Sequence, residues 1–181
     1  MAEGMLLEDD DPHHEQPSSI DQYLKDVHDL PISTLLKRDE QLRSMLLSID
    51  PSIPKYVFTA SVKHHAQRCL EALGIDDLFV DIIDVKACGL ATKHSEQAFR
   101  AAMQVAGLTF DDDKEMESCI LLDDSLKNVQ CARSMGWRAI LVGTVGRDCG
   151  KVVRSDHAEH EIQRIHDLPL VLPELFVQCE D

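Results

Sequence analysis

Hydroxyl side chains lie where a predicted strand meets a predicted helix. The stretch Lys55–Ala60 is rich in β-branched and aromatic residues and is typical of a strand. It carries Thr59 near its end, and Ser61 follows directly as a candidate N-cap of the next helix. A helix N-terminus presents N–H groups that have no partner within the helix, and these groups suit an anion. The residue types at this junction therefore favour a phosphate group as ligand.

Paired carboxylates follow a second apolar stretch. Residues 119–122 read as a strand and lead directly into Asp123 and Asp124. Two adjacent acids at a strand end are costly to bring together without a cation, so a hard metal such as Mg²⁺ is a natural partner. The alternative interpretation is structural, because Asp124 or Ser125 could instead cap the helix that follows.

The order of predicted elements determines where these groups lie. Apolar strands alternate with helices of amphipathic pattern, which favours successive βα units and a parallel sheet. Ligands of such sheets bind outside the carboxyl ends of the strands, where both polar junctions fall. The predicted strands are 55–60, 79–83, 119–122, 138–142 and 161–165, and the predicted helices are 35–49, 63–73, 95–106, 126–135 and 170–177.

Three of the predicted helices end in the same way. Gly74, Gly107 and Gly136 each follow the last helical turn, and each is followed by an apolar residue. A left-handed glycine before an apolar residue that folds back on the last turn is typical of a Schellman stop. The repeated stop supports the predicted boundaries of these helices.

A lysine that lies between these two junctions in the sequence completes a pattern of three motifs. The motifs VFT59, TK93H and ILLD123D124 resemble the second, third and fourth motifs of the haloacid dehalogenase-like hydrolase superfamily. The likeness extends over about residues 20–177, and it is most similar to the pyrimidine 5′-nucleotidase-like branch. The segments that carry it are YVFTASVKHHAQRCLEALGIDDLF, KHSEQAF, LLDDSLKN and HDLPLVLPELF.

This resemblance implies a Rossmann-like parallel α/β sheet with flanking helices and a Mg²⁺-dependent phosphohydrolase. It implies that Thr59, Ala60, Ser61 and Lys93 bind the phosphate, with Thr59 and Lys93 as catalytic residues. It further implies that Asp123 and Asp124 bind the metal directly or through water. The implied substrate is a small phosphorylated molecule such as a nucleoside monophosphate.

The chain departs from the family pattern at three places. Ala60 stands where family members usually have Asn, and His94 stands where Pro is usual. The first motif, an apolar strand followed by Asp-x-Asp that supplies the nucleophile, is absent. The alternative candidate is MLLEDDDP, in which Asp9 and Asp11 have the right spacing but Glu8 interrupts the strand.

The missing motif predicts that the chain lacks the first, central strand and most of the helical cap. We therefore expect it to be inactive as it stands. The family's implied strand order is 5-4-1-2-3, so the neighbours of the absent strand must pair with each other or borrow a strand. The borrowed strand would come from Met5–Leu7 or from a partner chain. We therefore expect that the chain could self-associate through an open sheet edge.

Composition limits the other functions. The net charge is −15, which argues against nucleic-acid binding and against anionic membrane surfaces. Residues 1–30 hold nine acids and one base, so we expect residues 1–18 to form an acidic tail or loop. Residues 19–50 would be a remnant of the cap with a lead-in helix, and residues 51–181 the α/β core. Six cysteines without a CxxC pair and the lack of a secretory signal indicate a cytoplasmic or nuclear protein with reduced thiols.

Two other functional classes compete with a phosphohydrolase. A receiver domain of a phosphorelay uses similar residues, but its acids come first in the chain, whereas here they come last. The stronger alternative is a non-catalytic protein, either a pseudo-phosphatase or a truncated gene product, that acts by binding.

Overall fold

The computed structural model describes residues 30–145 and 150–177. The chain divides into two compact units, residues 1–30 and Pro31–Asp181, and the elements described here lie in the second. The predicted acidic tail and the stretch Met5–Leu7 fall outside the described residues. Within those residues, no helix has the length and apolar character needed to cross a membrane.

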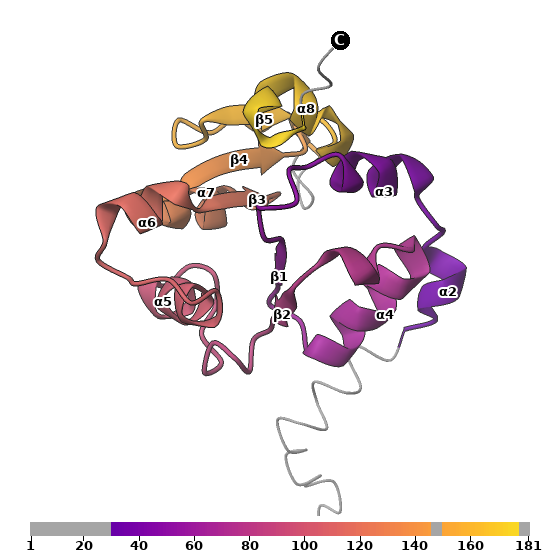
Figure 1. Cartoon of the computed structure of the whole chain (residues 1–181), viewed down its shortest axis with the longest axis horizontal. Helices are drawn as coiled ribbons and strands as arrows, with labels where there is room; N and C mark the ends of the chain where they lie inside the picture. Colours follow the sequence, from indigo (N-terminus) through magenta and orange to yellow (C-terminus); the bar gives the residue numbers. More distant parts are fainter. Residues whose placement is uncertain (1–29, 146–149, 178–181) are drawn as a thin grey trace, which may run out of the picture. The chain divides into compact units, whose positions relative to one another are not determined.

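Two parallel sheets form the centre of the described unit (Figure 1). In the first sheet, β1 (Tyr56–Phe58) pairs with β2 (Asp81–Ile83). In the second, β4 (Arg138–Val142) lies between β3 (Ile120–Asp123) and β5 (His160–Ile162). The parallel pairing and the helix after each of β1, β2 and β3 confirm the predicted fold class.

The helices agree with the sequence predictions in the middle of the chain and differ at its ends. The lead-in helix is shorter than predicted, the closing helix is split around Leu172 and Pro173, and two helices were not predicted, α2 and α6. The α-helices are α2 (Ile32–Leu35), α3 (Glu40–Leu47), α4 (Lys63–Leu73), α5 (Glu96–Val105), α6 (Asp113–Ser118), α7 (Leu126–Ser134) and α8 (Leu168–Val171); the short 3₁₀ turns are η1 (Asp76–Leu78), η2 (Ile165–Asp167) and η3 (Pro173–Leu175).

All three predicted glycine stops are present. At the end of α4, the N–H of Gly74 donates to Glu71 O and the N–H of Ile75 donates to Leu70 O, 3.0 and 3.1 Å away. The ends of α5 and α7 repeat this pair of bonds. Gly74 has a φ of +73°, and a Cβ there would lie 2.8 Å from the Arg38 guanidinium. The positive φ favours glycine at this position, and a larger residue would also displace the Arg38 side chain.

The predicted N-cap of α4 is wrong. The N-cap residue is Val62, and Ser61 Oγ is buried without a hydrogen-bond partner among the described residues. The cap comes instead from Asp84, which lies directly after β2 and accepts a hydrogen bond from the N–H of Lys63 at 2.9 Å. This carboxylate also accepts from the N–H of Ala87 at 2.8 Å, so one buried acid holds both a helix start and a loop.

Apolar residues cluster on both faces of the strands. Neighbouring residues of a strand point to opposite faces, and here Ile83 belongs to one buried cluster while Ile82 belongs to the other. The first cluster is filled by α5 and α7, and the second by α3, α4 and the C-terminal turns. Phe99 is fully buried in the first cluster and makes edge contacts with Phe58 and Trp137 at centroid distances of 5.6 and 4.9 Å.

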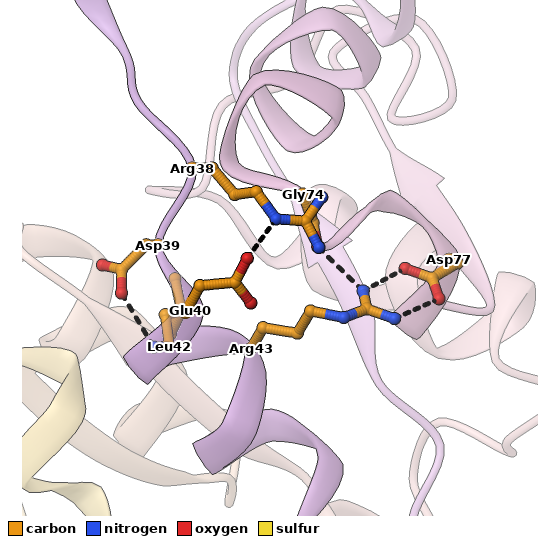
Figure 2. Close-up of polar contacts among 7 residues, drawn as sticks. All are labelled: Arg38, Asp39, Glu40, Leu42, Arg43, Gly74 and Asp77. Atoms are coloured by element: carbon orange, nitrogen blue, oxygen red, sulfur yellow. Dashed lines mark hydrogen bonds and ion pairs between the residues drawn. The ribbon is translucent and has the colours of Figure 1, made fainter.

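An ion pair and a hydrogen bond from Arg43 join α3 to η1 and to the end of α4 (Figure 2). The guanidinium of Arg43 makes two hydrogen bonds with the carboxylate of Asp77, at 2.5 and 2.8 Å, and donates a third to Gly74 O at 2.8 Å. These bonds lower the pKa of Asp77. Asp39 caps α3 by accepting from the N–H of Leu42 at 2.8 Å. The lead-in helix is therefore fixed to the core by directional contacts as well as by apolar packing.

The two sheets do not pair with each other. In the described residues, β1 makes its ladder with β2 alone, and β3 makes its ladder with β4 alone. Direct re-pairing of β1 with β3 was one of the two expected remedies for a missing central strand, and it does not occur. The other remedy, a borrowed strand, involves residues outside the described part of the chain or a second chain.

Truncation of Phe99 should be severely destabilising. Phe99→Ala removes a fully buried ring with two aromatic neighbours, and we expect a loss of about 3–5 kcal/mol in the free energy of unfolding, measured by urea titration. The control is Leu170→Ala, since Leu170 is 81% exposed and should change stability by less than about 0.5 kcal/mol. A loss below about 1 kcal/mol for Phe99→Ala would contradict this picture of the core.

Candidate functional site

The carboxyl ends of β1 and β3 bring Lys93 and Asp123 together. Lys93 lies in the loop between β2 and α5, while Asp123 is the last residue of β3. The Lys93 ammonium donates to Phe58 O of β1 at 3.1 Å and contacts Asp123 Oδ2 at 2.5 Å. It also lies 5.5 Å from the centroid of the Phe58 ring. One ammonium group therefore contacts both sheets at their carboxyl ends.

The Lys93–Asp123 pair is well shielded from solvent. The side chain of Lys93 is 15% exposed and that of Asp123 is 4% exposed. Charges removed from water in this way must be compensated by close contacts and by further hydrogen bonds. Asp123 has those bonds, because its Oδ1 accepts from the N–H of Ser125 and from Asn128 Nδ2, each at 2.8 Å.

Asn128 is a site residue that the sequence analysis missed. It lies in the first turn of α7, is buried, and directs its amide nitrogen to Asp123. Its Oδ1 is buried without a hydrogen-bond partner among the described residues. The signal in the sequence was an Asn five residues after Asp123, but that spacing gives no indication that the helix turns it back towards the strand end.

Thr59 and Ser61 form a tight turn after β1. The Thr59 hydroxyl oxygen accepts from the N–H of Ser61 at 3.0 Å, while the N–H of Thr59 donates to Ile83 O of β2. The Thr59 hydroxyl proton is therefore free to point elsewhere. Ala60 is exposed, and Thr59 directly follows Phe58, whose carbonyl oxygen receives the Lys93 ammonium. The predicted phosphate-binding residues thus lie at the same sheet ends as Lys93.

The predicted N-terminal anion site of α4 is partly occupied by protein. The N–H of Lys63, in the first turn of α4, already donates to Asp84, as described above. An anion there would have to approach a helix end that already carries a carboxylate. This local arrangement moves the favourable place for an anion from the helix end towards Lys93.

The metal-binding and helix-capping interpretations of this segment concern different residues. Ser125 is the N-cap of α7 and accepts from the N–H of Asn128 at 3.4 Å, so the capping interpretation holds for Ser125. Asp124 is exposed. In the described residues, no group of three or more His, Cys, Asp or Glu side chains is arranged to hold a metal ion.

Cysteine chemistry is disfavoured beside the site. Cys88 lies in the loop that carries Lys93, is 2% exposed, and is a free thiol. Burial raises its pKa, and the negative charge of Asp84 raises it further. The group is therefore a protonated, packed side chain near neutral pH and not a nucleophile.

The shielding of the Lys93–Asp123 pair predicts a strong energetic coupling. A double-mutant cycle of Lys93→Met and Asp123→Asn should give a coupling energy of about 1–3 kcal/mol in urea unfolding, since each single change leaves a shielded partner unpaired. The matched control is the Lys63–Asp81 pair, which has the same 2.5 Å contact but is 58% and 41% exposed. Its cycle should give less than about 1 kcal/mol. Equal couplings in the two cycles would contradict the role of burial.

Comparison with known proteins identifies the family. A model of the haloacid dehalogenase-like hydrolases matches residues 10–136. Phosphate metabolism protein 8 of Saccharomyces cerevisiae is 28% identical over 162 residues, which cover 79% of this chain and 48% of that protein. The chain thus spans about half the length of this curated relative.

Solved structures share the fold at low sequence identity. A HAD phosphatase from Thermococcus onnurineus gives a TM-score of 0.56 at 19% identity and covers 87% of this chain and 64% of its own. The HAD-hydrolase YfnB from Bacillus subtilis, bound to magnesium, gives a TM-score of 0.52 at 18% identity, covering 67% of this chain and 48% of its own. The family match over most of the sequence, on a parallel α/β fold of the same kind, shows that this chain belongs to the haloacid dehalogenase-like hydrolases.

Proposed function

We propose that this chain carries the phosphate-binding side of a phosphohydrolase of the pyrimidine 5′-nucleotidase type. The observation that carries the proposal is the Lys93 ammonium, held at the carboxyl ends of both sheets by Phe58 O and Asp123. A fixed cation in a shielded place stabilises the negative charge that develops on a transferring phosphoryl group. The substrate class would be small phosphate monoesters, with nucleoside monophosphates as the first candidates.

Each predicted residue has a role in this proposal. The Thr59 hydroxyl would donate to a phosphoryl oxygen, and the backbone around Ala60 and Ser61 would border the same group. Lys93 would neutralise charge on the phosphoryl group. Because Ala60 replaces the family's usual Asn, the chain has one side-chain donor fewer for orienting the substrate, so binding would depend more on Lys93 and Thr59.

The donor set at the end of β3 is compatible with Mg²⁺. Mg²⁺ commonly takes one or two carboxylates and completes its shell with water and substrate phosphate, and Asp123 and Asp124 supply that number. Both oxygens of Asp123 already accept hydrogen bonds from protein groups, so a metal ion at Asp123 would compete with these donors. When bound, the ion would supply further positive charge beside the phosphoryl oxygens.

A binding protein without catalysis is the second candidate. The saturation of Asp123 by Lys93, Ser125 and Asn128 favours it, since the site is satisfied without a metal ion. In this case the chain would be a pseudo-phosphatase or truncated product that binds phosphorylated ligands or partners in the cytoplasm or nucleus. Residues 19–50 would then be a remnant of the helical cap.

The proposal predicts that the chain alone does not hydrolyse phosphate esters. With p-nitrophenyl phosphate or uridine monophosphate and Mg²⁺, turnover should stay at background, because Lys93 and Thr59 stabilise a reaction for which the sequence supplies no well-placed nucleophile. Clear activity that is lost in Asp9→Asn but kept in the neighbouring control Asp10→Asn would show instead that the segment MLLEDDDP supplies the nucleophile.

Magnesium binding should be weak. We expect a dissociation constant in the millimolar range or higher by titration calorimetry, because two carboxylates give a partial shell and Mg²⁺ releases water reluctantly. The variants are Asp123→Asn and Asp124→Asn, and the control is Asp76→Asn, at an exposed acid in η1. Micromolar affinity that disappears in either site variant and persists in the control would contradict the prediction.

A further inference from the structure

Asp84 is a buried acid to which the proposed function assigns no role. It follows β2 directly and is 7% exposed. An acid is rarely buried to this extent unless hydrogen bonds compensate for its removal from water. Its Oδ2 accepts from the N–H of Lys63 at 2.9 Å, and its Oδ1 accepts from the N–H of Ala87 at 2.8 Å. Each carboxylate oxygen therefore fixes the backbone of a different segment.

The first segment is the turn after β1, which carries Thr59. Lys63 is the first residue of α4, and the turn leads directly into it. Within the turn, the N–H of Ser61 donates to the Thr59 hydroxyl oxygen at 3.0 Å. Ser61 O in turn accepts from the N–H of Val85, the residue after Asp84, at 3.2 Å. Asp84 and its neighbour thus hold both the turn and the helix start that follows it.

The second segment is the loop between β2 and α5, which carries Lys93. Successive turn bonds run along this loop from an N–H to a carbonyl oxygen: Cys88 to Asp84 at 3.2 Å, Leu90 to Val85 at 2.8 Å, and Ala91 to Cys88 at 3.2 Å. Leu90 has a φ of +65°, a conformation that is uncommon for a residue with a side chain. Such a backbone persists only where the surrounding contacts hold it. The place of Lys93 therefore depends on how the loop is anchored at its start.

We propose that Asp84 is a positioning residue, which holds the Thr59 turn and the Lys93 loop in place relative to each other. The inference rests on the proposed function and adds to it a residue that acts through the backbone of its neighbours. Binding groups that are fixed before the ligand arrives gain affinity, because less freedom is lost on binding. One carboxylate that accepts from both segments supplies this rigidity.

The contact between Lys93 and Asp123 tests the inference without phosphate. Its coupling energy, from the double-mutant cycle of Lys93→Met and Asp123→Asn in urea, should fall by at least about half in an Asp84→Ala background. The matched control is Asp81→Ala, at an acid of β2 that also accepts from a backbone N–H, that of Ile82. There the coupling should be unchanged. A purely structural role of Asp84 would lower the stability of every variant in the cycle and leave the coupling intact, and this result would overturn the proposal.

A second variant breaks one of the two bonds and keeps the acid. Lys63→Pro removes the N–H that donates to Asp84, at the first position of α4, where proline is favoured. Val62 before it has the extended backbone that a following proline requires, with φ −81° and ψ 148°. Amide exchange at Ala87 should then speed by at least roughly tenfold, because its acceptor is no longer held on the other side. Lys63→Ala keeps the N–H and should leave this rate unchanged. An unchanged rate in Lys63→Pro would overturn the proposal.

Titration with inorganic phosphate, followed by nuclear magnetic resonance, connects the inference to the proposed function. Asp84→Ala should raise the dissociation constant for phosphate by at least roughly tenfold, and Asp81→Ala should leave it unchanged, because only the first variant releases the turn and the loop. Unchanged binding in Asp84→Ala would overturn the proposal, and so would tighter binding, which would show that the carboxylate repels phosphate. If the wild-type chain binds no phosphate, the proposed function fails, and the coupling and exchange measurements still decide the role of Asp84.

Discussion

The buried contact of Lys93 with Asp123 and Phe58 O determines much of the rest of the structure. It is a charged link between two sheets that share no ladder among the described residues, and it is largely shielded from solvent. Such a pair is costly unless further hydrogen bonds compensate its removal from water. Asn128 and the N–H of Ser125 meet that demand for Asp123, so the first turn of α7 is part of the same interaction.

Within each strand, the middle residues pack in the apolar clusters and the residues at the carboxyl end make the polar contacts. Alternation places Ile82 and Ile140 in one cluster and Ile83 and Leu141 in the other, and each cluster is completed by its own helices. The carboxyl ends then carry the polar residues, where the strands leave the core. This division explains why the polar site residues lie close together although they are far apart in the sequence. They follow different strands, and the carboxyl ends of these strands lie on the same side of the core.

Local signals in the sequence were sufficient for many elements. The bounds of α4 and β4 were predicted as observed, and all three glycine stops are present, because a repeating apolar pattern and a left-handed glycine act over a few residues. The fold class followed from the alternation of these elements. The rule on strand ends selected the junctions at Thr59 and Asp123, and the family resemblance added Lys93, but the contact of Lys93 with Asp123 was not predicted.

The failures have a common physical cause. The cap of α4 is Asp84, which lies 21 residues from Lys63 in the sequence, so no local pattern could reveal it. Asn128 resembles any polar residue of a helix until the turn of α7 brings it to Asp123. Helix α6 has no apolar periodicity and begins with a local cap, in which Asp112 accepts from two N–H groups of the first turn. Each of these features depends on tertiary proximity or on one short hydrogen-bond motif.

The proposed function depends on the third N–H of Lys93. Among the described residues this donor has no acceptor, although the side chain is only 15% exposed, and a phosphoryl oxygen would supply that acceptor. A phosphate group bound there would bring negative charge close to the carboxylate of Asp123, which the same ammonium already contacts. A doubly charged phosphate monoester would therefore bring more negative charge to this end of the sheets than Lys93 alone can balance.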